Sequence, residues 1–208
     1  AENSPAPAVA PPLPLVAQPD VELRDPRVAV VHGQSVPFDG IEEGLTWPAL
    51  AKALGSRKPG DSVTLQVGRN VPLRDLLRAA WAVHAADVRV QSLDASGVMR
   101  AVELRAKREG AASAPGCHLA VFLEGSGALR VAAPGGTREV AGENAAASLA
   151  RSLAEEREKC PLRYVAFGAE SDASPWGPVF DVVLAVDRQK SAGDARYVLG
   201  QAMHVTAR

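Results

Sequence analysis

The sequence has few aromatic residues, few cysteines and no excess of charge of either sign. Of its 208 residues, 4% are aromatic and two are cysteine, and the formal net charge is −1. Lysine and arginine form no run and are not interleaved with aromatic residues, so the signals of nucleic-acid binding are missing. A stretch of about eighteen consecutive apolar residues, which a membrane-spanning helix requires, is missing too. We therefore expect neither nucleic-acid binding nor a membrane span in this chain.

Residue patterns of catalytic and metal sites are also scarce. Histidine occurs four times, at widely separated positions without metal-ligand spacing: His32, His84, His118 and His204. Residues 125–127 contain Gly-Ser-Gly but do not complete the Gly-x-Ser-x-Gly pattern of a nucleophile turn, and a hairpin explains them better. Paired glutamates at 42–43 and 155–156 are typical of solvated surfaces rather than of acid–base catalysis. These patterns predict a non-enzymatic protein with no catalytic, cofactor-binding or metal-binding residues.

Hydrophobic residues make up 47% of the chain, which is sufficient for a core in each of two small domains. Their pattern is clearest between residues 62 and 93. Residues 63–67 alternate apolar and polar side chains, as a strand with one buried face does. Pro72 stands where a helix would begin, Asn70 is placed to cap that helix, and residues 88–93 alternate again. The segment therefore predicts a strand, a helix and a second strand parallel to the first.

The predicted helix has one apolar face and one charged face. Residues at helical spacing form the apolar face: Leu73, Leu76, Leu77, Ala80, Trp81 and His84. Charged residues form the opposite face: Arg74, Asp75 and Arg78.

The same pattern recurs about a hundred residues later. Residues 162–168 form the predicted strand, residues 171–178 contain the prolines of the helix start, and residues 195–199 form the closing strand. Each copy is preceded by a further helix, predicted at 46–57 and at 143–159, and by an extended pair of strands. We therefore predict an α+β fold of two tandem β-β-α-β-α-β modules, each with its helices packed on one face of a small mixed sheet.

Composition divides the chain into four segments. Residues 1–24 are rich in proline and alanine and predict a disordered spacer, with a tail that has no function as the alternative. Residues 25–107 form the first module, residues 108–116 a linker rich in glycine, alanine and serine, and residues 117–208 the second module.

Three segments of these modules match a known pattern. Residues 68–73 and 169–176 each supply a small residue, polar residues and a proline-containing helix start, and residues 182–193 match a second helix with its glycine stop. In these segments and in the order of its elements, the chain resembles the periplasmic domain of the ExbD/TolR biopolymer-transport family, here in tandem duplicate.

This resemblance implies a non-enzymatic protein of the bacterial cell envelope, located in the periplasm. It implies a place in or beside an ion-driven motor like ExbB/ExbD or TolQ/TolR, with contact to peptidoglycan or to another envelope partner. The resemblance also implies homodimers of a single module, and a duplicated chain can supply both halves of such a pseudo-dimer itself. The alternative is a soluble periplasmic binding or adaptor protein that uses the duplicated fold without a motor.

Two pairs of residues are candidates for contacts that join parts of the fold. Cys117 and Cys160 each precede a predicted strand, and they can form a disulfide if those strands run parallel side by side in an oxidising compartment. Two unrelated buried thiols are the alternative. Trp81 and Trp176 are large enough to anchor a contact between the modules, although each can instead fill the core of its own module.

Overall fold

The computed structural model of the protein describes residues 11–56, 61–83, 87–106, 117–133, 136–140, 145–160, 162–189 and 195–200. Within these residues, strands from both ends of the chain join in one sheet of eleven strands, and four helices accompany it. The α+β class predicted from the sequence is therefore confirmed. Among the described helices, none has both the length and the apolar character needed to cross a bilayer.

The first half of the chain contains six of the described strands and two of the helices. Its elements are β1 (Val21–Asp25), β2 (Val28–Val31), β3 (Gln34–Pro37), α1 (Pro48–Leu54), β4 (Val63–Val67), α2 (Leu73–Ala82), β5 (Val88–Leu93) and β6 (Met99–Ala106). The second half contains the other five strands and two helices. Its elements are β7 (Cys117–Leu123), β8 (Leu129–Ala133), β9 (Gly136–Val140), α3 (Ala145–Lys159), β10 (Leu162–Ala169), α4 (Trp176–Gln189) and β11 (Arg196–Leu199).

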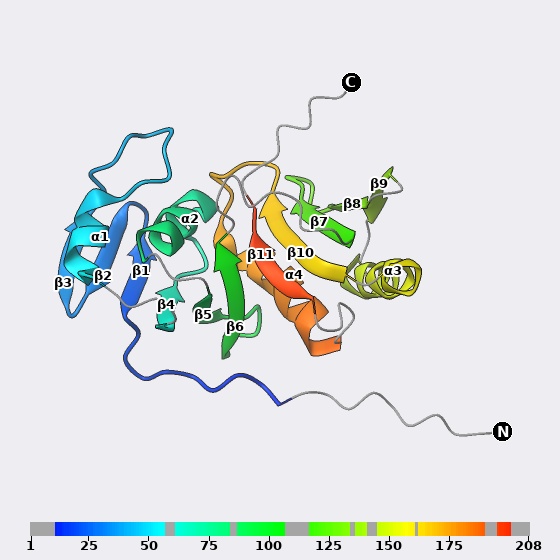
Figure 1. Ribbon diagram of the computed structural model, residues 1–208, viewed down its shortest axis with the longest axis horizontal. Coiled ribbons are helices and arrows are strands. Elements are labelled where there is room, and N and C mark those ends of the chain that lie inside the picture. Colours follow the sequence, from blue (N-terminus) through cyan, green and yellow to red (C-terminus); the bar gives the residue numbers. More distant parts are fainter. Residues whose placement is uncertain are drawn as a thin grey trace.

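The two halves share one strand order. It is β3-β2-β1-β4-β5 in the first half and β9-β8-β7-β10-β11 in the second. β1 pairs antiparallel with β2 and parallel with β4, and β7 pairs in the same way with β8 and β10. The parallel pairs β4–β5 and β10–β11 are each connected through a helix, α2 and α4. Figure 1 shows the first half, coloured blue to green, beside the second half, coloured green to red.

Each half opens with three strands, where the sequence predicted two. The additional strand of the first half is β1, which lies partly within the predicted spacer of residues 1–24 and buries Val21 and Leu23 beside β4. The additional strand of the second half is β9, where the sequence predicted a loop. Both strands are five residues long and carry charged residues, so their apolar alternation is too short to stand out in the sequence.

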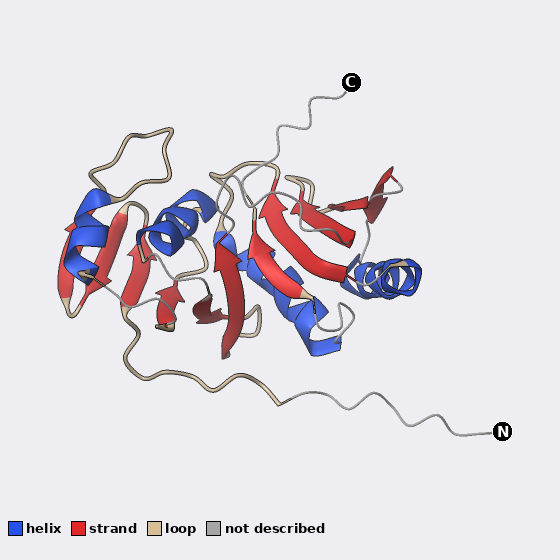
Figure 2. Cartoon of the chain, in the orientation of Figure 1, coloured by secondary structure: helices blue, strands red, loops and turns tan. Residues whose placement is uncertain are grey.

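The strands form one continuous sheet, so the prediction of a small sheet for each module is wrong. β6 pairs antiparallel with β5 and, at its end, parallel with β11, where Arg105 lies opposite Val198 and Ala106 opposite Leu199. Figure 2 shows the strands following one another across the width of the molecule. The unpaired backbone groups at the edge of one half find partners on the other, which removes two exposed sheet edges. The predicted linker, residues 108–116, lies outside the described residues.

The first turn of α1 is held by a side chain from the preceding loop. The backbone amide of Ala49 donates to both carboxylate oxygens of Asp39, at 2.9 and 3.1 Å. α2 has no such cap: the helix begins at Leu73, and the expected capping residue Asn70 makes no side-chain cap hydrogen bond. The amides at the start of α2 find their acceptors in the second half of the chain.

The charged face predicted for α2 is partly buried. Asp75 is 2% exposed and Arg78 is 1% exposed. Arg78 Nη1 lies 3.0 Å from Asp75 Oδ1, its Nε donates to the carbonyl of Gly44 at 3.0 Å, and its guanidinium carbon lies 3.9 Å from the ring centre of Phe38. Asp75 also accepts a hydrogen bond from the amide of Arg27 at 2.8 Å. The charged pair therefore has partners that replace water. It joins α2 to the turn between β1 and β2 and to the loop before α1.

Candidate binding site at the junction of the two halves

The start of α2 is capped by backbone carbonyls of the second half. The amide of Leu73 donates to the carbonyl of Ser174 at 2.9 Å, and the amide of Arg74 donates to that of Asp172 at 2.8 Å. The first amides of a helix have no acceptor within the helix. Here the segment that leads into α4 supplies the acceptors.

The start of α4 is capped in return by the first half. The amide of Trp176 donates to the carbonyl of Val71 at 2.9 Å, and the amide of Gly177 donates to that of Arg69 at 2.8 Å. Each of the two helices therefore depends on the chain that precedes the other helix. This reciprocal cap is a physical link between the halves that neither half can form alone.

Two prolines and one of the predicted tryptophans lie at this junction. Pro72 and Pro175 form an antiparallel bridge between the two helix starts. The indole of Trp176 is fully buried and lies 5.4 Å from the ring of Phe180, measured between ring centres. Trp81 is half-buried and packs against the core. The indole nitrogens of both tryptophans are buried and have no hydrogen-bond partner among the described residues.

An ion pair crosses the junction beside the reciprocal cap. Arg69 Nη1 and Nη2 donate to the two carboxylate oxygens of Asp181 in α4, at 2.9 and 2.6 Å, and Nη1 also donates to the carbonyl of Leu93 at 2.9 Å. The hydrogen bond with Asp181 raises the pKa of the Arg69 guanidinium. A planar guanidinium that donates to both oxygens of a carboxylate fixes the orientation of the two side chains as well as the distance between them.

A second ion pair joins α4 to the turn between β5 and β6. Asp94 accepts hydrogen bonds from the hydroxyl of Ser96 at 2.6 Å, from the amide of Val98 at 3.0 Å and from Arg100 at 3.3 Å. Arg188 of α4 lies 3.2 Å from the same carboxylate. The pKa of Asp94 is lowered, chiefly by the hydrogen bond from Ser96 and then by that from Val98.

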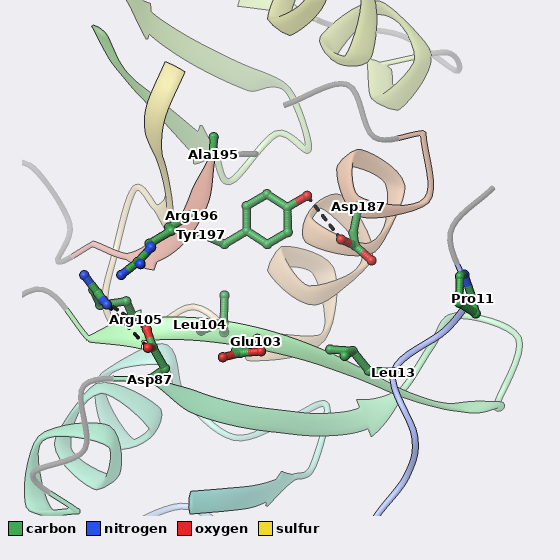
Figure 3. A pocket seen from close by; sticks show the side chains of 10 residues that line it. All are labelled: Pro11, Leu13, Asp87, Glu103, Leu104, Arg105, Asp187, Ala195, Arg196 and Tyr197. Carbon is green, nitrogen blue, oxygen red and sulfur yellow. Dashed lines mark hydrogen bonds and ion pairs between the residues drawn. The ribbon is translucent and has the colours of Figure 1, made fainter. Parts of the chain in front are cut away.

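A cavity of about 400 Å³ opens between β6 and β11, where the two halves meet. Residues from both halves and from the start of the described chain line it: Pro11, Leu13, Asp87, Glu103, Leu104, Arg105, Asp187, Ala195, Arg196 and Tyr197 (Figure 3). The volume lies within the range of small-ligand pockets. Among these residues are two arginines, three carboxylates and one tyrosine, so the walls carry charges of both signs.

Two of the charged residues form an ion pair at one end of the cavity. Arg105 Nε lies 3.0 Å from Asp87 Oδ1, and Arg105 Nη2 lies 3.3 Å from Asp87 Oδ2. The hydrogen bond with Asp87 raises the pKa of Arg105. In Figure 3 the side chain of Arg196 extends toward this same end.

The tyrosine of the cavity extends in the other direction. The hydroxyl of Tyr197 donates to Asp187 Oδ1 at 3.2 Å (Figure 3). The ring of Tyr197 meets that of Phe167 edge-on, with ring centres 5.6 Å apart. Burial raises the pKa of Tyr197, and the charge of Asp187 adds to the effect. The tyrosine therefore stays protonated through the neutral range.

The segment before β1 is tied to the sheet next to the cavity. The amide and carbonyl of Val16 form two hydrogen bonds with the side-chain amide of Gln91 in β5, at 2.8 and 2.9 Å. Asp20 and Thr64 exchange a similar pair, at 2.9 and 2.8 Å. In Figure 1 the blue segment before β1 runs along one side of the sheet toward β6. The predicted spacer of residues 1–24 is therefore ordered in its described part.

The backbone segments that carry the two cysteines of the predicted disulfide lie near each other. In the parallel ladder of β7 and β10, Cys117 is opposite Leu162, two residues beyond Cys160. The two strands run parallel, as the prediction required. The side chain of Cys117 is not among those described, so the disulfide stays a prediction.

The remaining candidates of the sequence fall outside the junction. His32 is exposed in the turn between β2 and β3. His84 and His204 lie outside the described residues, as does the side chain of His118. Residues 125–127 form the turn of the β7–β8 hairpin, as predicted, with the amide of Gly127 donating to Glu124 at 2.9 Å.

Sequence reasoning placed Trp176 at a contact between the modules, but it missed the charged groups of the junction and its cavity. Arg69 and Asp181 are separated by 112 positions, and no spacing rule connects residues so far apart. The sequence contained one weak indication of the cavity. Arg196 and Tyr197 place a charge and a polar ring in a short predicted strand. Comparisons of this chain with protein-family models, with curated proteins and with solved structures find no match.

Proposed function

We propose that this chain is a non-enzymatic protein of the bacterial cell envelope whose halves are duplicated ExbD/TolR-like modules that act together as a covalent pseudo-dimer. In this proposal it is located in the periplasm, as part of or accessory to an ion-driven motor like ExbB/ExbD or TolQ/TolR. It couples that motor to peptidoglycan or to an envelope partner. The envelope role rests on the family resemblance of the sequence.

The observation that carries the pseudo-dimer is the reciprocal cap. Two halves with one strand order contact each other through corresponding segments, namely the start of α2 and the start of α4. Contact between the same surface of two copies is the arrangement of a two-fold symmetric dimer. The ion pair of Arg69 and Asp181 adds an orientation-specific contact beside it.

In-cell crosslinking tests the envelope role. A photoreactive amino acid at Ile41, which is 72% exposed, is introduced into the full chain in its native cells. We expect the chain in the periplasmic or membrane fraction, crosslinked to a motor subunit or another envelope protein. Recovery from the cytoplasmic fraction, with crosslinks to cytoplasmic proteins alone, would contradict the proposal.

The cavity at the junction favours a second candidate, a periplasmic binding or adaptor protein without a motor. Pockets of this size with a few charged groups are typical of sites that hold a small molecule. A chain that binds a small molecule and shows no crosslink to a motor subunit would support this second function over the first.

A further inference from the structure

The cavity between β6 and β11 exists because these two strands separate. Among the described residues, their ladder consists of two residue pairs, Arg105 with Val198 and Ala106 with Leu199. Before these pairs the strands diverge, and the side chains of Glu103, Leu104 and Tyr197 line the space between them. Because β6 belongs to the first half and β11 to the second, the cavity is formed by the junction itself.

The charges on its walls are not all neutralised. Arg105 is paired with Asp87, and Asp187 accepts a hydrogen bond from the neutral hydroxyl of Tyr197. Arg196 is exposed and has no hydrogen-bond or ion-pair partner among the described residues. The same holds for Glu103, although Arg89 is its cross-strand neighbour in β5. Arg196 and Glu103 thus supply a cation and an anion at the mouth of the cavity that are available to a ligand.

These two charges lie on opposite sides of the opening. Glu103 belongs to β6 and Arg196 to β11. Figure 3 shows Arg196 extending toward the Arg105 end, whereas Glu103 lies on the strand below the Tyr197 ring. Between them, Leu104 and the Tyr197 ring provide apolar wall. A ligand with a carboxylate at one end and an ammonium at the other is complementary to this arrangement.

We propose that this cavity binds a small zwitterion, an amino acid or short peptide, with its carboxylate on Arg196 and its ammonium group on Glu103. A guanidinium binds a carboxylate through two parallel hydrogen bonds, and a carboxylate side chain accepts from an ammonium group. A volume of about 400 Å³ accommodates a ligand of one to a few residues. The inference does not depend on the envelope role, because it rests on the cavity alone.

The test compares three forms of one dipeptide on the full chain. Alanyl-alanine, its N-acetylated form and its C-terminal amide are titrated by calorimetry. We expect saturable binding of the free dipeptide, and binding at least about tenfold weaker when either charge is blocked, since each charged hydrogen bond is lost. Equal binding of all three forms, or no saturable binding of the free dipeptide at millimolar concentration, would overturn the proposal.

Single variants assign each charge of the ligand to its residue. R196A should weaken the free dipeptide to the level of the amide and leave no difference between those two forms. E103Q should likewise abolish the difference between the free and the acetylated dipeptide. R151A, which removes an exposed arginine on α3, is the matched control and should leave binding unchanged. Binding that both R196A and E103Q leave unaltered would show that the dipeptide binds elsewhere.

Discussion

Arg78 shows how a residue that looks like surface can become part of the interior. Its spacing in α2 places it on the charged side of the helix, yet its side chain is 1% exposed. The reason is the loop before α1, whose Gly44 carbonyl and Phe38 ring cover the guanidinium. A helical pattern indicates which side faces the sheet, but it does not indicate that a loop will cover the other side.

Removing this guanidinium should cost far more than removing a neighbouring one. We expect R78A to lower the free energy of unfolding by about 3–5 kcal/mol, because Asp75 is left as a buried charge without its cation. Urea denaturation of the full chain measures the change. R74A, on the same helix, is the matched control and should change stability by less than about 0.5 kcal/mol. A loss from R78A as small as that from R74A would contradict the burial of the pair.

Tyr197 should make the stability of the protein depend on pH in the alkaline range. In the unfolded chain a tyrosine ionises near pH 10, whereas burial and Asp187 raise the pKa of Tyr197 in the folded protein. Above about pH 10 the unfolded state therefore loses a proton that the folded state keeps, so stability falls as pH rises. A single proton corresponds to a slope of at most about 1.4 kcal/mol per pH unit.

The variant Y197F should reduce this slope, as measured by urea denaturation between about pH 9 and 11.5. The chain has one other tyrosine, Tyr164. Y164F keeps Tyr197 and should retain the slope. An unchanged slope in Y197F would show that the tyrosine is not held in its protonated form by the fold.

At the scale of elements, α2 and α4 owe their starts to each other. The sequence places prolines at both starts, as helix beginnings favour, but in the structure no side chain caps α2. The carbonyls that complete the first turn of α2 come from a segment about a hundred residues away. A helix start that lacks a side-chain cap can thus be completed by backbone groups from a distant part of the chain.

Gly177 tests how closely the two helix starts approach. An added Cβ at this position would lie 2.9 Å from the Cβ of Arg69 and 3.0 Å from its Cζ and Nε. In most helices alanine is more favourable than glycine by about 1 kcal/mol. We expect the opposite sign here: G177A should lower the melting temperature, because Arg69 must move away from Asp181. A higher melting temperature would show that Arg69 does not lie so close.

At the scale of the whole molecule, the two halves should depend on each other for stability. Residues 11–106 and 117–208 are produced separately and mixed. Each half then lacks acceptors for the first amides of its second helix and exposes an edge of the sheet. We expect each half to be less stable than the full chain and the two to associate in sedimentation experiments. Two stable, monomeric halves that do not associate would contradict the pseudo-dimer.

The disulfide is the other prediction for the whole molecule. The parallel ladder of β7 and β10 brings the backbone at Cys117 opposite Leu162, close in sequence to Cys160. A bond between the cysteines would close a loop of over forty residues, which the chain-entropy model values at about 4 kcal/mol. Oxidised protein that is denatured without reductant and alkylated should show no alkylated cysteine by mass spectrometry. Two alkylated cysteines would disprove the bond.

Strong periodicity in the sequence was sufficient to predict several of the local elements. Alternation in residues 63–67 and 88–93 predicted β4 and β5, and the apolar stripe between them predicted α2. The class of the fold followed from the order of such elements. β1 and β9 were missed because five residues with charged members carry too little alternation to be distinguished from loops.

Which elements cap, pair with and pack against one another depends on the tertiary structure. The reciprocal cap, the Arg69–Asp181 ion pair and the cavity with Arg196 and Glu103 join residues that are distant along the chain. The spacing of apolar residues in the sequence indicates which face of a helix or strand will be buried, because residues at that spacing lie on the same face. The spacing does not indicate which other element covers that face, because that depends on the packing of the whole chain. The continuous sheet and the candidate site both arise from that packing.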